Sequence, residues 1–68
     1  MPTTGRELRR KRRNLDITVI AIAARMGLSR QSVHVLERDG EPPAERVRQY
    51  EEALEALRAD TEPAEATA

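Results

Sequence analysis

The stretch from Thr18 to Arg38, TVIAIAARMGLSRQSVHVLER, constrains the fold of this chain more than any other segment. Its first half has apolar residues at helical spacing, which predict the buried face of a short helix: Ile22, Ala23 and Met26. Gly27 follows directly, where helices commonly end on a left-handed residue that glycine adopts without steric cost. Ser29 then offers a hydroxyl that caps a new helix. We therefore expect two short helices joined by a tight turn.

The second helix of this pair has few apolar residues, because only Val33 and Leu36 are obvious core positions. The other residues of its opening turns are hydrogen-bonding or small: Arg30, Gln31, Ser32, His34 and Val35. The 3.6-residue period predicts that Val35 points outward, and a third core residue is the alternative. A helix, a short turn with glycine and a second helix make a helix-turn-helix, whose second helix lies in the DNA major groove.

Several short motifs occur in order along the chain: Ile17-Thr18, Ile22-Ala23, Met26-Gly27-Leu28-Ser29, Val33 and Leu36-Glu37-Arg38. With them, residues from about Gly5 to Leu57 resemble the phage repressor and Cro family of helix-turn-helix domains, the XRE family. The resemblance implies an all-α fold, a compact four- to five-helix lambda-repressor-like domain with its helix-turn-helix at about residues 18–38. It also implies a dimer on DNA. The family usually has Gln after the Thr18 position, where it holds the DNA backbone, and this sequence has Val19.

Composition agrees with a small domain of packed helices. The chain has 68 residues, no cysteine and a single aromatic residue, Tyr50. Without cysteine, neither disulfides nor thiolate metal sites are available. No apolar run approaches the roughly 18 residues that span a bilayer. The Arg-rich start also lacks the apolar segment of a signal peptide. We expect a cytoplasmic protein that does not contact a membrane.

Charge is distributed unevenly, although the net charge of the whole chain is zero. Residues 1–38 hold nine Arg and Lys against three Asp and Glu, and residues 39–68 hold three against nine. Such asymmetry predicts a basic face that meets a polyanion. The run Arg9–Arg13 is interpreted either as a basic targeting tract or as a solvated helix face.

Two further helices are expected around the central pair. Thr4 and Glu7 resemble a capping box, which predicts a first helix over about residues 5–13. After it, Leu15 and Ile17 are expected to turn inward. The third helix is expected to end at Asp39-Gly40, and a last helix to run over about residues 43–59.

The last helix carries an apolar stripe at spacings of three and four: Val47, Tyr50, Leu54 and Leu57. Either all four close the core, or the far end of the stripe also contacts a second copy of the chain. On the second interpretation the dimer contacts are Tyr50, Leu54 and Leu57. The predicted domain covers residues 1–59, and residues 60–68 are predicted to form a disordered acidic tail.

Three residues of the third helix are predicted to contact bases. Arg30 and Gln31 match family positions that reach base edges, and arginine fits guanine as glutamine fits adenine. Val35 also matches such a position and would favour a thymine methyl group.

A second set of residues is predicted to contact the DNA backbone or to support those that do: Arg12, Arg13, Thr18, Ser32, His34 and Arg38. Thr18 combines a hydroxyl with the free N–H groups of a helix start. In the family resemblance, Arg12 pairs with Glu37 and braces the first helix against the third. Two exposed charges that never meet are the alternative.

Val19 and Ile20 stand where related domains usually have polar residues. They pack locally against the last helix, or they form an apolar patch that binds a partner.

An enzyme is not expected. The chain has one histidine and no cysteine, and its three glycines are scattered rather than gathered in a phosphate-binding loop. No cofactor, metal or small-molecule ligand is predicted. The sequence predicts a sequence-specific, Cro- or repressor-like DNA-binding transcriptional regulator that binds an inverted-repeat operator in double-stranded DNA as a homodimer. The alternative is an interaction protein of the same fold, such as an antitoxin or a transcription accessory factor.

Overall fold

The computed structural model describes residues 3–61, and in that part of the chain four helices account for all regular structure. They are α1 (Gly5–Asn14), α2 (Val19–Met26), α3 (Arg30–Arg38) and α4 (Ala44–Thr61). The predicted all-α fold is confirmed, with four helices between residues 3 and 61. The last helix continues to Thr61, and the rest of the predicted acidic tail lies outside the described residues.

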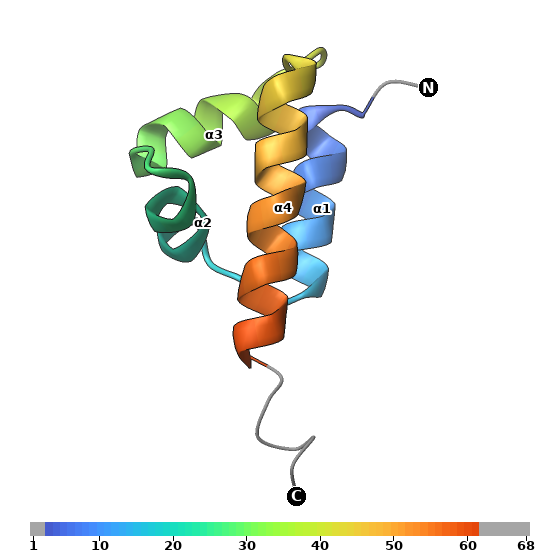
Figure 1. Ribbon diagram of the computed structural model, residues 1–68. Helices are drawn as coiled ribbons and strands as arrows, with labels where there is room; N and C mark the ends of the chain where they lie inside the picture. Colours follow the sequence, from blue (N-terminus) through green and yellow to red (C-terminus); the bar gives the residue numbers. More distant parts are fainter. Residues whose placement is uncertain (1–2, 62–68) are drawn as a thin grey trace, which may run out of the picture.

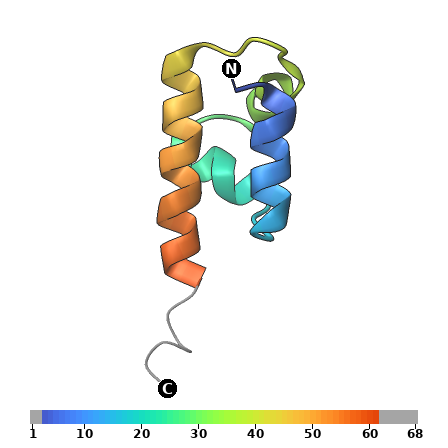
Figure 2. The ribbon, with the colours of Figure 1, turned by 90° about the vertical axis from the view of Figure 1, so that its right-hand side faces the viewer.

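The helices pack in two pairs. α1 and α4 run side by side in the same direction, and α2 and α3 cover one side of them (Figure 1). Figure 2 shows α2 behind the space between α1 and α4. The start of α1 lies close to the end of α3. This arrangement leaves the outer faces of α1 and α3 open to solvent.

The core draws one fully buried side chain from each helix: Leu8, Ile22, Val33 and Tyr50. Ile17, Leu36 and Leu54 complete it with two alanines. Burying a large apolar side chain contributes roughly 1.5–3 kcal/mol. Because every helix supplies one of these residues, displacing any one helix would expose the core to solvent.

The predicted caps at the starts of α1 and α2 and the predicted glycine end of α2 are confirmed. Thr4 accepts a hydrogen bond from the Glu7 N–H, and the Glu7 carboxylate accepts one from the Thr4 N–H, which makes a capping box. Thr18 caps α2. Gly27 ends α2 in the left-handed region with φ 73°. These local signals fix the directions of the helices, because each satisfies backbone groups that a helix end leaves without partners.

Leu15 does not turn inward as predicted, since 37% of its surface is exposed. It lies at the C-cap of α1, and the next residue, Asp16, has φ 57°. That left-handed residue reverses the chain, so only Ile17 reaches the core. The two apolar residues at the start of α2 also separate. Val19 packs against the core, whereas Ile20 is 61% exposed.

Gly5 permits the close approach of α1 to α3. Its N–H donates to the Asp39 carbonyl oxygen over 2.8 Å. A Cβ at this position would lie 2.2 Å from the Leu36 carbonyl oxygen. Only glycine fits here without displacing backbone.

None of the helices between residues 3 and 61 is both long and apolar enough to cross a membrane.

We predict that Gly5→Ala lowers the free energy of unfolding by about 1–3 kcal/mol, because the added methyl group meets backbone that cannot move aside. Gly40→Ala is the matched control, since a Cβ there has no heavy atom of the described residues within 4 Å. Urea denaturation of both variants measures the difference. Equal stability of the two variants would contradict the close contact.

Candidate DNA-binding surface

The outer face of α3 gathers most of the side chains that were predicted to contact DNA. A shallow hollow along it is lined by Ser29, Arg30, Gln31, His34, Val35 and Arg38. Val35 points outward, with 62% of its surface exposed. The inner face of the same helix is buried through Val33, Leu36 and Glu37. The helix is therefore divided into a packed side and an open side.

The turn before α3 sets where this open side begins. The Leu28 N–H donates to the Ala23 carbonyl oxygen over 2.9 Å, which closes the chain around left-handed Gly27. Ser29 then caps α3 by accepting a hydrogen bond from the Ser32 N–H over 3.1 Å. Its hydroxyl also donates to the Ser32 hydroxyl over 3.0 Å. The first bond fixes the turn that follows α2, and the other two fix the first turn of α3.

A buried ion pair holds α3 from the inside. The Arg12 guanidinium donates to both carboxylate oxygens of Glu37, over 2.8 Å from Nε and 3.2 Å from Nη2. A third hydrogen bond runs from Arg12 Nη1 to the Ile17 carbonyl oxygen over 3.0 Å. The hydrogen bond to Glu37 is the main reason that the pKa of Arg12 lies above its ordinary value. Such bidentate pairs are the strong kind of charged contact.

Tyr50 of α4 is the third member of this network. Its hydroxyl donates to Glu37 Oε2 over 2.5 Å. Burial of the ring raises the pKa of Tyr50 well above its ordinary value, and the hydrogen bond to Glu37 raises it further. The network thereby joins three helices through one carboxylate, because Arg12 comes from α1, Glu37 from α3 and Tyr50 from α4.

The predicted pairing of Arg12 with Glu37 is present. Arg12 is buried and donates to Glu37 and to the Ile17 carbonyl oxygen, which fits the supporting role predicted for it. The prediction for the apolar stripe of α4 needs correction. Tyr50 and Leu54 are not dimer contacts, because both are buried in the core of their own chain. Leu57 remains partly buried against that core. Most of the apolar stripe of α4 is therefore buried within its own chain.

The remaining predicted backbone contacts lie on other elements. Thr18 is exposed at the start of α2, where its hydroxyl oxygen accepts from the Ala21 N–H over 3.1 Å. Arg13 is exposed on α1. It lines a hollow with three arginines that were not predicted as contacts: Arg6, Arg9 and Arg10. Their spacing along α1 was the signal in the sequence that could have identified them.

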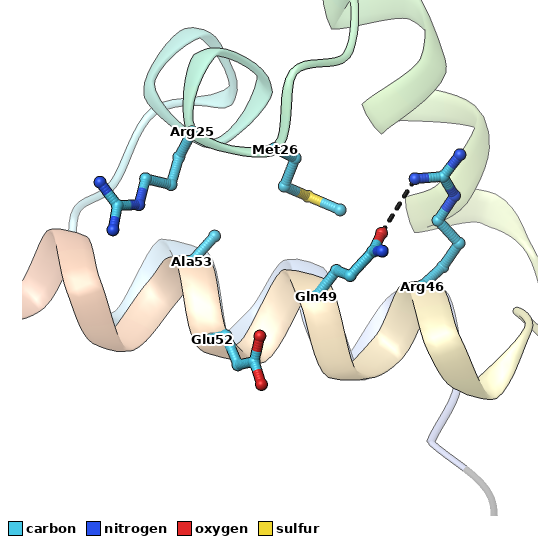
Figure 3. Close-up of a pocket in the computed structure, with 6 residues that line it drawn as sticks. All are labelled: Arg25, Met26, Arg46, Gln49, Glu52 and Ala53. Carbon is cyan, nitrogen blue, oxygen red and sulfur yellow. Dashed lines mark hydrogen bonds between the residues drawn. The ribbon is translucent and has the colours of Figure 1, made fainter.

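A third hollow lies between the end of α2 and the middle of α4 (Figure 3). Met26 extends toward Gln49 there, and the Gln49 side-chain oxygen accepts from Arg46 over 2.9 Å. The lining side chains are mostly polar or charged, and two of them already bond each other. Among residues 3–61 there is no group of three or more His, Cys, Asp or Glu residues arranged to hold a metal ion. None of these three hollows resembles the apolar pocket that small-molecule sites require.

Comparison with known families decides the assignment. A family model described as helix-turn-helix matches residues 8–59, which include all of α2 and α3. The chain belongs to this XRE-type helix-turn-helix family. No curated protein and no solved structure gave a significant match. The family consists of DNA-binding regulatory domains and is not a class of enzymes, so the chain is a DNA-binding transcription regulator.

We predict that Tyr50 stabilises the fold below about pH 10, the ordinary tyrosine pKa, and that this contribution declines at higher pH. The folded pKa is raised, so the unfolded chain loses its phenolic proton first and unfolding becomes easier as pH rises. Tyr50 is the only aromatic residue of the chain, which makes tyrosinate absorbance a direct probe of its ionisation. Tyr50→Phe is the control for stability and should show a shallower alkaline decline. Ionisation of folded Tyr50 near its ordinary pKa would contradict the buried hydrogen bond to Glu37.

Proposed function

We propose that the protein is a Cro- or repressor-like regulator that reads an inverted-repeat operator as a homodimer, with α3 in the major groove of each half-site. One observation carries this proposal. The outer face of α3 presents Arg30, Gln31 and Arg38 without a hydrogen bond or ion pair from their side chains to any described residue. Polar side chains kept free on a rigid helix are the requirement for base recognition.

The roles within α3 follow from position and chemistry. Arg30 and Gln31 begin the helix, and the N-terminal residues of such a helix reach furthest into the groove. Their forked side chains each fit two atoms of one base edge. Val35 lies one turn further along the same face and offers its methyl groups to a thymine. His34 lies beside them in the same hollow and contacts a base or a phosphate.

Backbone contacts complete the surface. Arg38 lies at the end of α3, where its charge suits a phosphate rather than a base edge. The hydroxyl of Ser32 accepts from Ser29, so its own proton remains available for a phosphate oxygen. The proton of the Thr18 hydroxyl is also available for a phosphate oxygen, since the hydroxyl oxygen accepts from the Ala21 N–H. Arg13 adds a charge from α1. Bound in this way, the protein would repress by blocking access of polymerase to the promoter.

An interaction protein of the same fold, such as an antitoxin or a transcription accessory factor, is the second candidate. Ile20 favours it, because a large apolar side chain that is 61% exposed is suited to a protein partner. Selection from random DNA pools separates the two functions. An enriched sequence motif supports the regulator, and no enrichment at low salt supports the interaction protein.

We predict that Gln31→Ala and Arg38→Ala weaken DNA binding in different ways. Gln31→Ala should cost roughly 1–3 kcal/mol on the preferred site and relax the preference at one position of each half-site. Arg38→Ala should weaken specific and non-specific binding by similar factors, because a phosphate contact does not depend on sequence. Binding assays on selected and scrambled duplexes distinguish these effects. If folded Gln31→Ala selects the same motif as the wild type, α3 does not recognise the bases.

We predict further that two half-sites are centred about 10 base pairs apart, since a two-fold dimer places its α3 helices about 34 Å apart. Binding to operators with systematically varied spacing, measured by electrophoretic mobility shift, tests this geometry. Affinity should be highest at one full turn and should fall when half a turn is inserted. Equal affinity for one isolated half-site and for the full repeat would mean that a monomer is the binding unit.

A further inference from the structure

Four arginines form a continuous row on the outer face of α1. Arg6, Arg9, Arg10 and Arg13 are spaced by three and four residues, so they share one side of the helix. All four are exposed. The opposite side of α1 packs inward through Gly5, Leu8 and Arg12. We call the row of four the arginine stripe.

The arginine stripe has no partner within the described part of the chain. None of its four side chains makes a hydrogen bond or an ion pair there. Like charges at this helical spacing repel each other, so the free stripe destabilises α1. Binding of a polyanion would remove that repulsion.

Several other cations of the protein have side-chain partners, unlike the four arginines of the stripe. Lys11, also on α1, donates to Glu51 of α4 over 2.7 Å. The arginines of α4 all have partners: Arg46 bonds Gln49, Arg48 lies 3.6 Å from Glu52, and Arg58 lies 3.3 Å from Glu55. Among the described residues, acidic side chains therefore pair with the cations on one side of the molecule and leave the arginine stripe charged.

The arginine stripe is continuous with the end of α3. Arg6 and Arg9 line a groove together with Arg38 and Gly40. The two carboxylates in that groove are already engaged, Glu37 by Arg12 and Asp39 by the Glu41 N–H over 2.9 Å. The Gly5 N–H bond to the Asp39 carbonyl oxygen holds the start of the stripe against the end of α3. A row of free positive charge thus leads away from the proposed recognition helix.

We propose that the arginine stripe binds phosphates of the same DNA duplex, beyond the base pairs that α3 contacts. This inference rests on the proposed function and extends its footprint. The stripe is a row of four exposed, charged donors along one helix, which suits the repeating charges of a phosphate backbone. Contacts from the arginine stripe increase the affinity for DNA and its dependence on salt. The sequence preference is set by α3.

The test compares two triple variants with the same change of charge. In the stripe variant Arg6, Arg9 and Arg10 are replaced by Gln. In the control variant, three arginines of α4 are replaced by Gln: Arg46, Arg48 and Arg58. Dissociation constants are measured against salt on two duplexes that carry the motif selected by the wild-type protein. The short duplex ends at the motif, and the long duplex extends it by a helical turn on each side.

On the long duplex, the stripe variant should have a salt slope shallower than that of the wild type by about two to three units per protomer, or about five for the homodimer, at roughly 0.9 per phosphate contact. The control variant should change by less than one unit. On the short duplex the stripe variant and the wild type should have similar slopes. The selected motif should be the same for all three proteins, because the arginine stripe does not contact bases.

Thermal unfolding without DNA gives a second measurement. The stripe variant should melt at a higher temperature than the wild type in low salt, because the repulsion along α1 is removed. If the triple variant does not fold, Arg6→Gln alone should reduce the slope on the long duplex by about one unit per protomer, or about two for the homodimer.

Three outcomes would overturn parts of this scheme. If the stripe variant and the wild type have the same salt slope on the long duplex, and the selected motif still depends on Gln31, the arginine stripe does not bind phosphates. The proposed function would then still stand. A slope reduced equally on both duplexes places the phosphates within the motif and overturns the extended footprint. A wild-type protein that selects no motif and does not bind duplex DNA overturns the proposed function itself.

Discussion

The fold depends on one buried carboxylate. Glu37 accepts hydrogen bonds from Arg12 and Tyr50, so a single charged group ties α3 to both α1 and α4. Burying such a pair costs desolvation energy, and that cost is offset only when every donor and acceptor has a partner. Within the described part of the chain, no buried side-chain nitrogen or oxygen lacks one. Removing one member would leave the other charge buried and unpaired, which is more costly than never having buried the pair.

The position of this network explains how a domain this small presents a rigid surface. α3 has nine residues, too few to be a stable helix alone. It is held at its start by the Ser29 cap, along its inner face by Val33, and near its end by Glu37. With those constraints on one side, the outer face presents Arg30, Gln31 and Arg38, whose side chains make no hydrogen bond or ion pair with the described residues. These side chains are therefore available for binding.

Local signals made much of this predictable from the sequence. The caps at Thr4, Thr18 and Ser29 need only nearby backbone, so their residue types are sufficient to place them. Contacts between distant segments were harder to predict. The apolar spacing around Tyr50 indicates burial, but it does not reveal that the hydroxyl meets Glu37. Gly5 gave no signal at all, because its role depends on a carbonyl oxygen more than thirty residues away along the chain. Leu15 was predicted wrongly because the left-handed turn at Asp16 has no marker such as glycine.

Charge is the property in which composition and structure differ most. The net charge is zero, which alone predicts no affinity for nucleic acid. In the folded chain the cations of α4 have partners on α4, whereas those at the outer faces of α1 and α3 have none among the described residues. The net charge of zero is therefore the sum of one side with paired charges and another side with unpaired cations. A side with unpaired cations attracts polyanions, whereas a side whose cations are already paired does not. The distribution of ion pairs between the two sides, rather than the net charge, therefore sets which face of the domain suits a polyanion.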